Sequence, residues 1–175
     1  MKVCLVGEAA VGKTSLIRRF VLDQFDDAYA ATLGSKVSKR ELTATHKGET
    51  FSVGMMLWDI MGQKGFRELL QDAYFREAHG VLAVADVTRR STLADLRGWI
   101  DGVHEVAGQV PIVLLANKAD LRETSEVSDS EVASAAREYE ASHFLTSAKS
   151  GANVGVAFQA LADRVAAIRL ESSVR

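Results

Sequence analysis

The chain has 175 residues, 47% of them hydrophobic, and a formal net charge of −2 at pH 7. This length and composition suit one compact domain, 1–175, and the small net charge gives no reason to expect binding to nucleic acid or to an acidic membrane. The single cysteine, Cys4, excludes an internal disulfide and a Cys/His metal site. No apolar run could span a bilayer, and no signal peptide precedes the first strand. We therefore expect a cytoplasmic protein.

The first predicted elements are a strand, a glycine loop and a helix. The apolar run 3–6 is followed by GEAAVGKTS over 7–15, then by helical spacing to about Leu22. In this context G-x-x-x-x-G-K-[ST] predicts a phosphate-binding loop, because glycines let backbone amides surround phosphates at a helix N-terminus. Lys13 adds a charge, and the Thr14 hydroxyl can ligate Mg²⁺. A glycine turn without a ligand is the disfavoured alternative. The expected phosphate-binding residues are Gly7, Ala10, Val11, Gly12, Lys13, Thr14 and Ser15.

A polar stretch over 23–31 precedes two predicted strands, 36–44 and 50–59, which form a long hairpin. Alternating apolar residues predict one buried face for the second strand, whereas the charged first strand is typical of a sheet edge. An apolar strand over 81–85 follows, and Thr92 with Asp95 predicts a helix start. The expected core residues of this helix are Leu93, Leu96, Trp99, Ile100, Val103 and Val106.

Strands and helices continue to alternate to the C-terminus. The run 111–116 is typical of a central parallel strand, Ser128 and Glu131 predict a capping box, and a short strand over 143–146 follows. The expected buried side of the last helix holds Val154, Phe158, Leu161, Val165 and Ile168. This alternation predicts an α/β, doubly wound fold: a six-stranded, mostly parallel sheet with one antiparallel edge strand and helices on both faces.

Two loops after predicted strands indicate guanine as the base. Asn117, Lys118 and Asp120 follow the strand 111–116, at the edge where open α/β sheets bind ligands. A carboxylate there can accept the ring N–H and the amine of guanine, whereas adenine would leave it unpaired. A second loop, with Ser147, Ala148 and Lys149, fits against the same base. The guanine motif, and the lack of an acceptor-binding lid, disfavour an ATP-dependent kinase or transport ATPase.

Residues 59–63 follow the alternating strand and supply candidate metal and γ-phosphate contacts. Asp59 can hold Mg²⁺ through water, and the Gly62 amide can meet the γ-phosphate. Thr32, in the polar stretch after the first helix, is the remaining candidate Mg²⁺ ligand. We therefore expect Thr14, Thr32 and Asp59 around the metal.

These motifs, in this order, resemble those of the Ras superfamily of small GTPases, most of all its Rab branch. Residues 29–34 resemble the first Rab switch, 58–63 the second, and 78–88 the strand that follows, so the resemblance covers essentially the whole chain. It implies a P-loop NTPase fold and a molecular switch that binds GTP or GDP with Mg²⁺ and hydrolyses GTP. Segments 26–38 and 59–76 would change order with the γ-phosphate and bind effectors, activating partners and exchange partners. We expect a monomer.

The resemblance also implies roles for single residues. Gln63 would orient the attacking water, and Lys13 would stabilise charge on the phosphates. Phe25 falls where the family places an aromatic ring against guanine, with a core position as the alternative, and Tyr29 belongs to the same nucleotide-binding set. No arginine lies between Asp26 and Ala31, so hydrolysis is expected to be slow without an activating partner.

Several residues depart from the family pattern. Ile60 and Met61 replace the usual Thr-Ala, Lys64 replaces a glutamate, and Val37 and Ala73 replace two residues of the Rab aromatic triad. These changes leave the nucleotide chemistry intact but argue against the partners of eukaryotic Rabs, and we favour a divergent, prokaryotic relative. They also leave open a GTP- or GDP-bound scaffold with little or no turnover.

The C-terminus shows no prenylation signal, so we expect no intrinsic membrane anchor in this sequence. A membrane would be reached only peripherally, through partners or through a tail outside the sequence. Two arginine pairs, Arg18–Arg19 and Arg89–Arg90, are expected to lie on the solvated surface.

Overall fold

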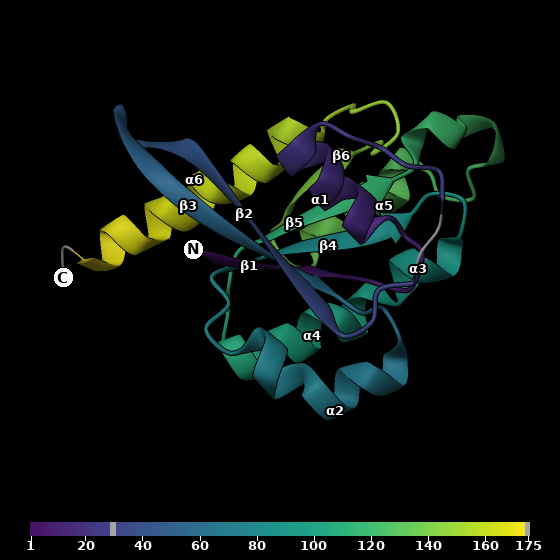
Figure 1. Ribbon diagram of the computed structural model, residues 1–175, viewed down its shortest axis with the longest axis horizontal. Helices are drawn as coiled ribbons and strands as arrows, with labels where there is room; N and C mark the ends of the chain where they lie inside the picture. The colour runs from purple at the N-terminus through teal and green to yellow at the C-terminus, as the bar shows by residue number, and fades with distance from the viewer. Residues whose placement is uncertain (29–30, 174–175) are drawn as a thin grey trace.

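One six-stranded sheet organises the computed structural model, which describes residues 1–28 and 31–173. The strand order is β2-β3-β1-β4-β5-β6, and only the β2–β3 pairing is antiparallel among the described strands. The predicted α/β fold is therefore confirmed (Figure 1). The elements are β1 (Lys2–Val6), α1 (Lys13–Leu22), β2 (Ser35–His46), β3 (Glu49–Ile60), α2 (Lys64–Phe75), β4 (Gly80–Asp86), α3 (Arg90–Ala94), α4 (Leu96–Ala107), β5 (Ile112–Asn117), the 3₁₀ helix η1 (Ala119–Thr124), α5 (Asp129–Arg137), β6 (Ser142–Leu145) and α6 (Val154–Ser173).

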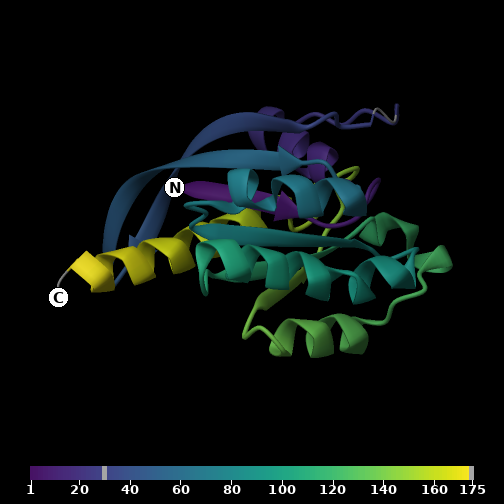
Figure 2. The ribbon, with the colours of Figure 1, turned by 90° about the horizontal axis from the view of Figure 1, so that it is seen from below.

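Each face of the sheet has its own hydrophobic core. Val3 and Leu5 of β1 pack with α1 and α6, whereas Cys4 and Val6 pack with α4 and α5 on the opposite face. The two-residue period of a strand produces this separation, and Figure 2 shows helices on both sides of the sheet. Among the described residues, no helix combines the length and apolarity needed to cross a membrane.

The predicted hairpin is confirmed and is longer at both ends than expected. It pairs Ser35 with Ile60 at one end and His46 with Glu49 at the other. Lys47 and Gly48 make the turn with φ values of 50° and 83°, and two successive left-handed residues are what a two-residue hairpin with the right twist requires. The tip of the hairpin lies beside the C-terminal half of α6 (Figure 2), where His46 Nε2 is 3.9 Å from Glu171 Oε1.

The structure differs from the sequence analysis at three places. Helix α2 is present although no helix was predicted there. Thr92 is not a helix cap but lies inside α3, where its hydroxyl accepts from Asp86 N (2.9 Å) and donates to Arg89 O (2.7 Å). Ile168 is 45% exposed and therefore does not belong to the buried side of α6, contrary to the prediction from the sequence. The capping box at the start of α5 is confirmed.

Truncating the centre of α6 should destabilise the fold far more than truncating its end. Phe158 is fully buried and stacks on Phe20 with ring centroids 4.1 Å apart. Phe158→Ala leaves a cavity there and is expected to lower the free energy of unfolding by about 3–5 kcal/mol. Ile168→Ala, on the same helix, is the matched control and should lower it by less than about 1 kcal/mol. Equal losses in urea unfolding would contradict this description of the core.

Candidate functional site

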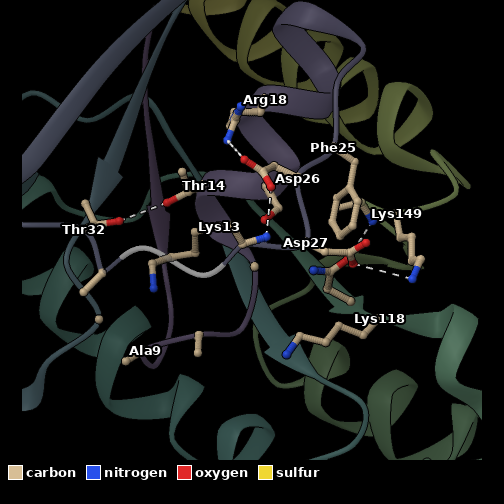
Figure 3. Close-up of a pocket in the computed structure, with 18 of the residues that line it drawn as sticks. Ala9, Lys13, Thr14, Arg18, Phe25, Asp26, Asp27, Thr32, Lys118 and Lys149 are labelled. Atoms are coloured by element: carbon tan, nitrogen blue, oxygen red, sulfur yellow. Dashed lines mark hydrogen bonds and ion pairs between the residues drawn. The ribbon is translucent and has the colours of Figure 1, made fainter.

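A cavity of about 510 Å³ opens at the carboxyl end of the sheet. Its walls come from the glycine loop and the start of α1, from residues 25–28 and 31–32, from residues 61–63, and from the loops after β5 and β6 (Figure 3). The fold thus brings together segments that are far apart in the sequence. The predicted site residues that line the cavity are Ala10, Gly12, Lys13, Thr14, Ser15, Phe25, Thr32, Gly62, Gln63, Asn117, Lys118, Asp120, Ala148 and Lys149.

The remaining predicted site residues that the structure describes do not line the cavity. Four of them support its wall, namely Gly7, Val11, Asp59 and Ser147. The Gly7 carbonyl accepts from Lys13 Nζ at 2.8 Å, and the Val11 carbonyl accepts from Asn117 Nδ2 at 2.9 Å. Tyr29 lies outside the described residues, as does the side chain of Lys64.

The backbone of the glycine loop leaves no room for a side chain at Gly12, within the loop, or at Gly62, which packs against it. At Gly12, whose φ is +101°, a Cβ would fall 2.3 Å from Asn117 Nδ2. At Gly62 it would fall 2.5 Å from Ala9 N, so the segment after β3 lies directly against the loop. Glycine is required at both positions because of this close approach.

Lys13 supplies a buried positive charge at the centre of the loop. Its side chain is almost fully buried, and Nζ donates to the carbonyls of Gly7 and Glu8, both at 2.8 Å. Burial lowers the pKa of Lys13 to about 8, against the opposing attraction of Asp59 and Glu8. Because neutral carbonyls compensate this charge incompletely, the site favours an anion in the cavity.

Thr14, Thr32 and Asp59 meet at one side of the loop, as the sequence predicts. Thr14 Oγ1 lies 3.0 Å from Thr32 Oγ1 (Figure 3). The Thr14 hydroxyl also donates to Asp59 Oδ2 at 2.5 Å. Within the described part of the chain, Asp59 Oδ1 is buried without a hydrogen-bond partner. Burial also raises the pKa of this carboxyl group. An orphaned carboxylate oxygen beside two hydroxyls fits a hard divalent cation such as Mg²⁺.

No competing metal site is evident elsewhere in the described residues. Within ranges 1–28 and 31–173, no group of three or more His, Cys, Asp or Glu side chains is placed to hold a metal.

Asn117, the last residue of β5, joins the glycine loop to the loop after β6. Its amide donates to Val11 O, and its Oδ1 accepts from Ala148 N at 3.2 Å. Asp120 Oδ1 accepts from Ser147 Oγ at 2.6 Å, which orients the carboxylate. Phe25 lines the cavity and also packs against the core of α1 and α6, so both predicted roles for its ring are compatible with its position.

Two ion pairs connect the segment after α1 to other walls of the cavity. Arg18 lies 3.7 Å from Asp26, and Lys149 lies 3.6 Å from Asp27 (Figure 3). Both carboxylates belong to exposed side chains, so each pair contributes little to stability. Their role is to connect this segment to α1 and to the loop after β6.

Sequence reasoning missed two charged residues beside the loop. Asp86 is buried at the end of β4, and its Oδ2 accepts from Lys118 Nζ at 2.7 Å and from Arg89 Nε at 3.1 Å. Arg89 Nη2 also donates to Ala9 O at 2.9 Å. The expectation that Arg89 is simply solvated is therefore wrong. The signal that could have found it is an aspartate ending a buried strand with an arginine three residues later.

Arg19 also differs from the expectation of a solvated surface residue. Its guanidinium donates to Ala148 O at 2.8 Å and to Lys149 O at 2.7 Å. It thereby anchors the loop after β6 to α1. Arg90, in contrast, is exposed and contacts Glu126 and Glu131 away from the loop.

Comparisons with known proteins agree with this geometry. The family model described as Ras family matches residues 2–167. The chain is 35% identical over 162 residues to the Ras-related protein Rab-13 of Canis lupus familiaris, a match that covers 92% of this chain and 77% of that protein. The matched range of the family model contains every residue that lines the cavity.

The charge state of Asp59 should control the stability of the ligand-free protein. Because its pKa is raised above 3.8, the folded chain keeps the proton at pH values where the unfolded chain has lost it. The contribution of Asp59 to the free energy of unfolding therefore falls as pH rises through that window. Asp59→Asn removes the buried charge and should stabilise the chain at neutral pH by on the order of 1–3 kcal/mol, with no gain near pH 4.

This test uses urea unfolding without nucleotide and with a chelator present. Asp72→Asn, at an exposed position in α2, is the matched control and should change stability by less than about 0.5 kcal/mol. A destabilisation by Asp59→Asn at every pH would contradict the assignment of an uncompensated carboxylate.

Proposed function

The chain belongs to the Ras family of small GTP-binding switch proteins, which are GTPases, and on that basis we propose that it binds GTP and GDP with Mg²⁺ in the cavity and hydrolyses GTP slowly. The observation that carries the proposal is the arrangement of groups around one cavity. A buried ammonium and an orphaned carboxylate oxygen lie at the glycine loop, and Asn117 and Asp120, at the end of β5 and just after it, line the same cavity. These groups match the phosphates, the metal and the base of a guanine nucleotide.

The glycine loop and Lys13 would hold the phosphates. The cavity lining includes Ala10 and Gly12 of the loop together with Thr14 and Ser15 at the start of α1, where backbone N–H groups have no partner within the helix. Bound Mg²⁺ would supply charge neutralisation on the β- and γ-phosphates, with Thr14, Thr32 and Asp59 as the residues that hold it.

Asp120 would select guanine over adenine. Its carboxylate, oriented by Ser147, can accept from the ring N–H and the exocyclic amine of guanine. Ala148 and Lys149 would border the base on one side, and Phe25 would contact one face of the ring. Lys118 shares the cavity wall but is held toward Asp86.

In hydrolysis, Gln63 would orient a water molecule toward the γ-phosphorus. The new bond forms from the water oxygen to phosphorus while the bond to the β–γ bridging oxygen breaks, giving GDP and phosphate. Lys13 would stabilise the charge that develops on the oxygens of the transferred group. No arginine lies between Asp26 and Ala31, and we propose that an activating partner accelerates the reaction. A scaffold without turnover is not favoured, because Gln63 lines the cavity.

Effectors, activating partners and exchange partners would contact segments 26–38 and 59–76, because Thr32 and Gly62 respond there to the γ-phosphate. We further propose that residues 1–175 form one G domain, that it acts as a monomer, and that it is cytoplasmic, with any membrane contact peripheral.

Replacing Gln63 should slow the chemical step. In single-turnover assays with GTP and Mg²⁺, the rate constant of the unaltered protein should lie below about 10⁻² s⁻¹, the value for a GTPase that carries its arginine in cis. Gln63→Leu should lower it by about tenfold or more, because water loses its orienting group. Gln109→Leu, at an exposed position, is the matched control. Loading of ATP in preference to GTP would overturn the assignment of the base, and GTP retention without conversion would favour the scaffold.

Lys13 should make nucleotide affinity depend on pH. Its pKa is about 8 without ligand, and bound phosphates raise it, so the complex binds the proton more tightly than the free protein does. GDP affinity should therefore be constant below pH 8 and fall above it by up to about tenfold per pH unit. Titration with fluorescent GDP measures this profile. Lys13→Arg keeps its charge, so its affinity, though weaker, should not show this fall. A flat profile for the unaltered protein would contradict the prediction.

A further inference from the structure

One residue of the glycine loop, Ala10, has a backbone conformation that is unfavourable for alanine. Ala10 lines the cavity and has a φ of +62°, in the left-handed region. A Cβ atom makes this region unfavourable, so an alanine stays there only when its surroundings hold it. Turning over the peptide between Ala9 and Ala10 would return Ala10 to negative φ and remove the strain.

Arg89 holds the carbonyl of that peptide. Its Nη2 donates to Ala9 O at 2.9 Å, while its Nε donates to Asp86 Oδ2 at 3.1 Å. Asp86 is buried and also accepts from Lys118 Nζ at 2.7 Å. The planar guanidinium is therefore fixed at two points, and one of these is itself fixed to the loop after β5.

Because the peptide between Ala9 and Ala10 is planar, the bond from Arg89 to the Ala9 carbonyl also fixes the direction of the Ala10 N–H. The C=O and N–H of a trans peptide point in opposite directions, and no cis peptide occurs in the described residues. With the Ala9 carbonyl accepting from Arg89, which is not part of the cavity lining, the Ala10 N–H points away from Arg89, and Ala10 itself lines the cavity.

We propose that Arg89 is a positioning residue that prevents the Ala9–Ala10 peptide from turning over and so keeps the Ala10 N–H directed at the phosphates of the nucleotide. This inference rests on the proposed function, because it assigns the anion in the cavity to those phosphates. Arg89 acts through Ala9 and Ala10 and does not touch the nucleotide. Through Asp86 and Lys118 it also connects the glycine loop to the loop after β5.

The test compares GDP dissociation rates by displacement of fluorescent GDP in the presence of Mg²⁺. Arg89→Ala should speed dissociation by about tenfold, the factor that corresponds to the strain of a left-handed alanine. Arg90→Ala is the matched control, because its neighbouring guanidinium contacts Glu126 and Glu131 and not the loop. Arg89→Lys, which keeps a cation beside Asp86 but lacks the fork, should also speed dissociation and gives the same test if Arg89→Ala does not fold.

The decisive variant combines Arg89→Ala with Ala10→Gly. Glycine adopts positive φ without strain, so the double variant, compared with Ala10→Gly alone, should lose most of the tenfold effect. A role of Arg89 that is only structural, through Asp86, would make the two changes additive and would overturn the proposal. Unchanged GDP dissociation in Arg89→Ala would overturn it too, whether or not hydrolysis slows. Failure of the unaltered protein to bind GDP would instead overturn the proposed function.

Discussion

The site depends on how closely the glycine loop approaches its neighbours. A Cβ on Gly7 would fall 2.2 Å from Val84 O, and the equivalent atoms on Gly12 and Gly62 would fall 2.3 Å from Asn117 Nδ2 and 2.5 Å from Ala9 N. These contacts fix the glycine loop against β4, the end of β5 and the segment after β3. The shape of the cavity is therefore set by the close packing of the loop backbone against its neighbours and by the side chain of Asn117, and Lys13 acts within that frame.

That frame holds charges that the protein compensates to different extents. Asp86 is satisfied by Lys118 and Arg89, whereas Asp59 keeps one oxygen unpaired and Lys13 contacts carbonyls. The charge of Asp86, which supports the glycine loop, is therefore fully compensated. The charges of Asp59 and Lys13, where a ligand would bind, are compensated incompletely. Such incomplete compensation costs stability in the ligand-free protein, as functional sites commonly do. In the proposed nucleotide complex it would concentrate the gain of binding at the phosphates and the metal.

Much of this could be predicted from sequence because the motifs are short and follow strand ends. The glycine loop follows β1, Asp59 lies at the end of β3, and the Asn117–Asp120 segment begins at the end of β5. The carboxyl ends of parallel strands meet at one edge of a sheet, so these motifs come together there. Helix α2 was missed although Phe66, Leu69 and Leu70 have helical spacing, because the segment was interpreted as a switch. The contact of Arg89 with Ala9 joins residues 80 positions apart, and no local pattern carries that information.

The length of the hairpin has a physical reason that the family pattern did not suggest. β2 is an edge strand, and α6 binds its outer side: Gln159 Nε2 donates to Thr43 O at 2.7 Å, and Asp163 Oδ1 accepts from Thr45 N at 3.0 Å. These bonds cover part of an edge that would otherwise offer pairing groups to other chains. They also fix the far end of β2, so that nucleotide-dependent rearrangement is expected at the near end, around Thr32, and not as a shift of the whole strand.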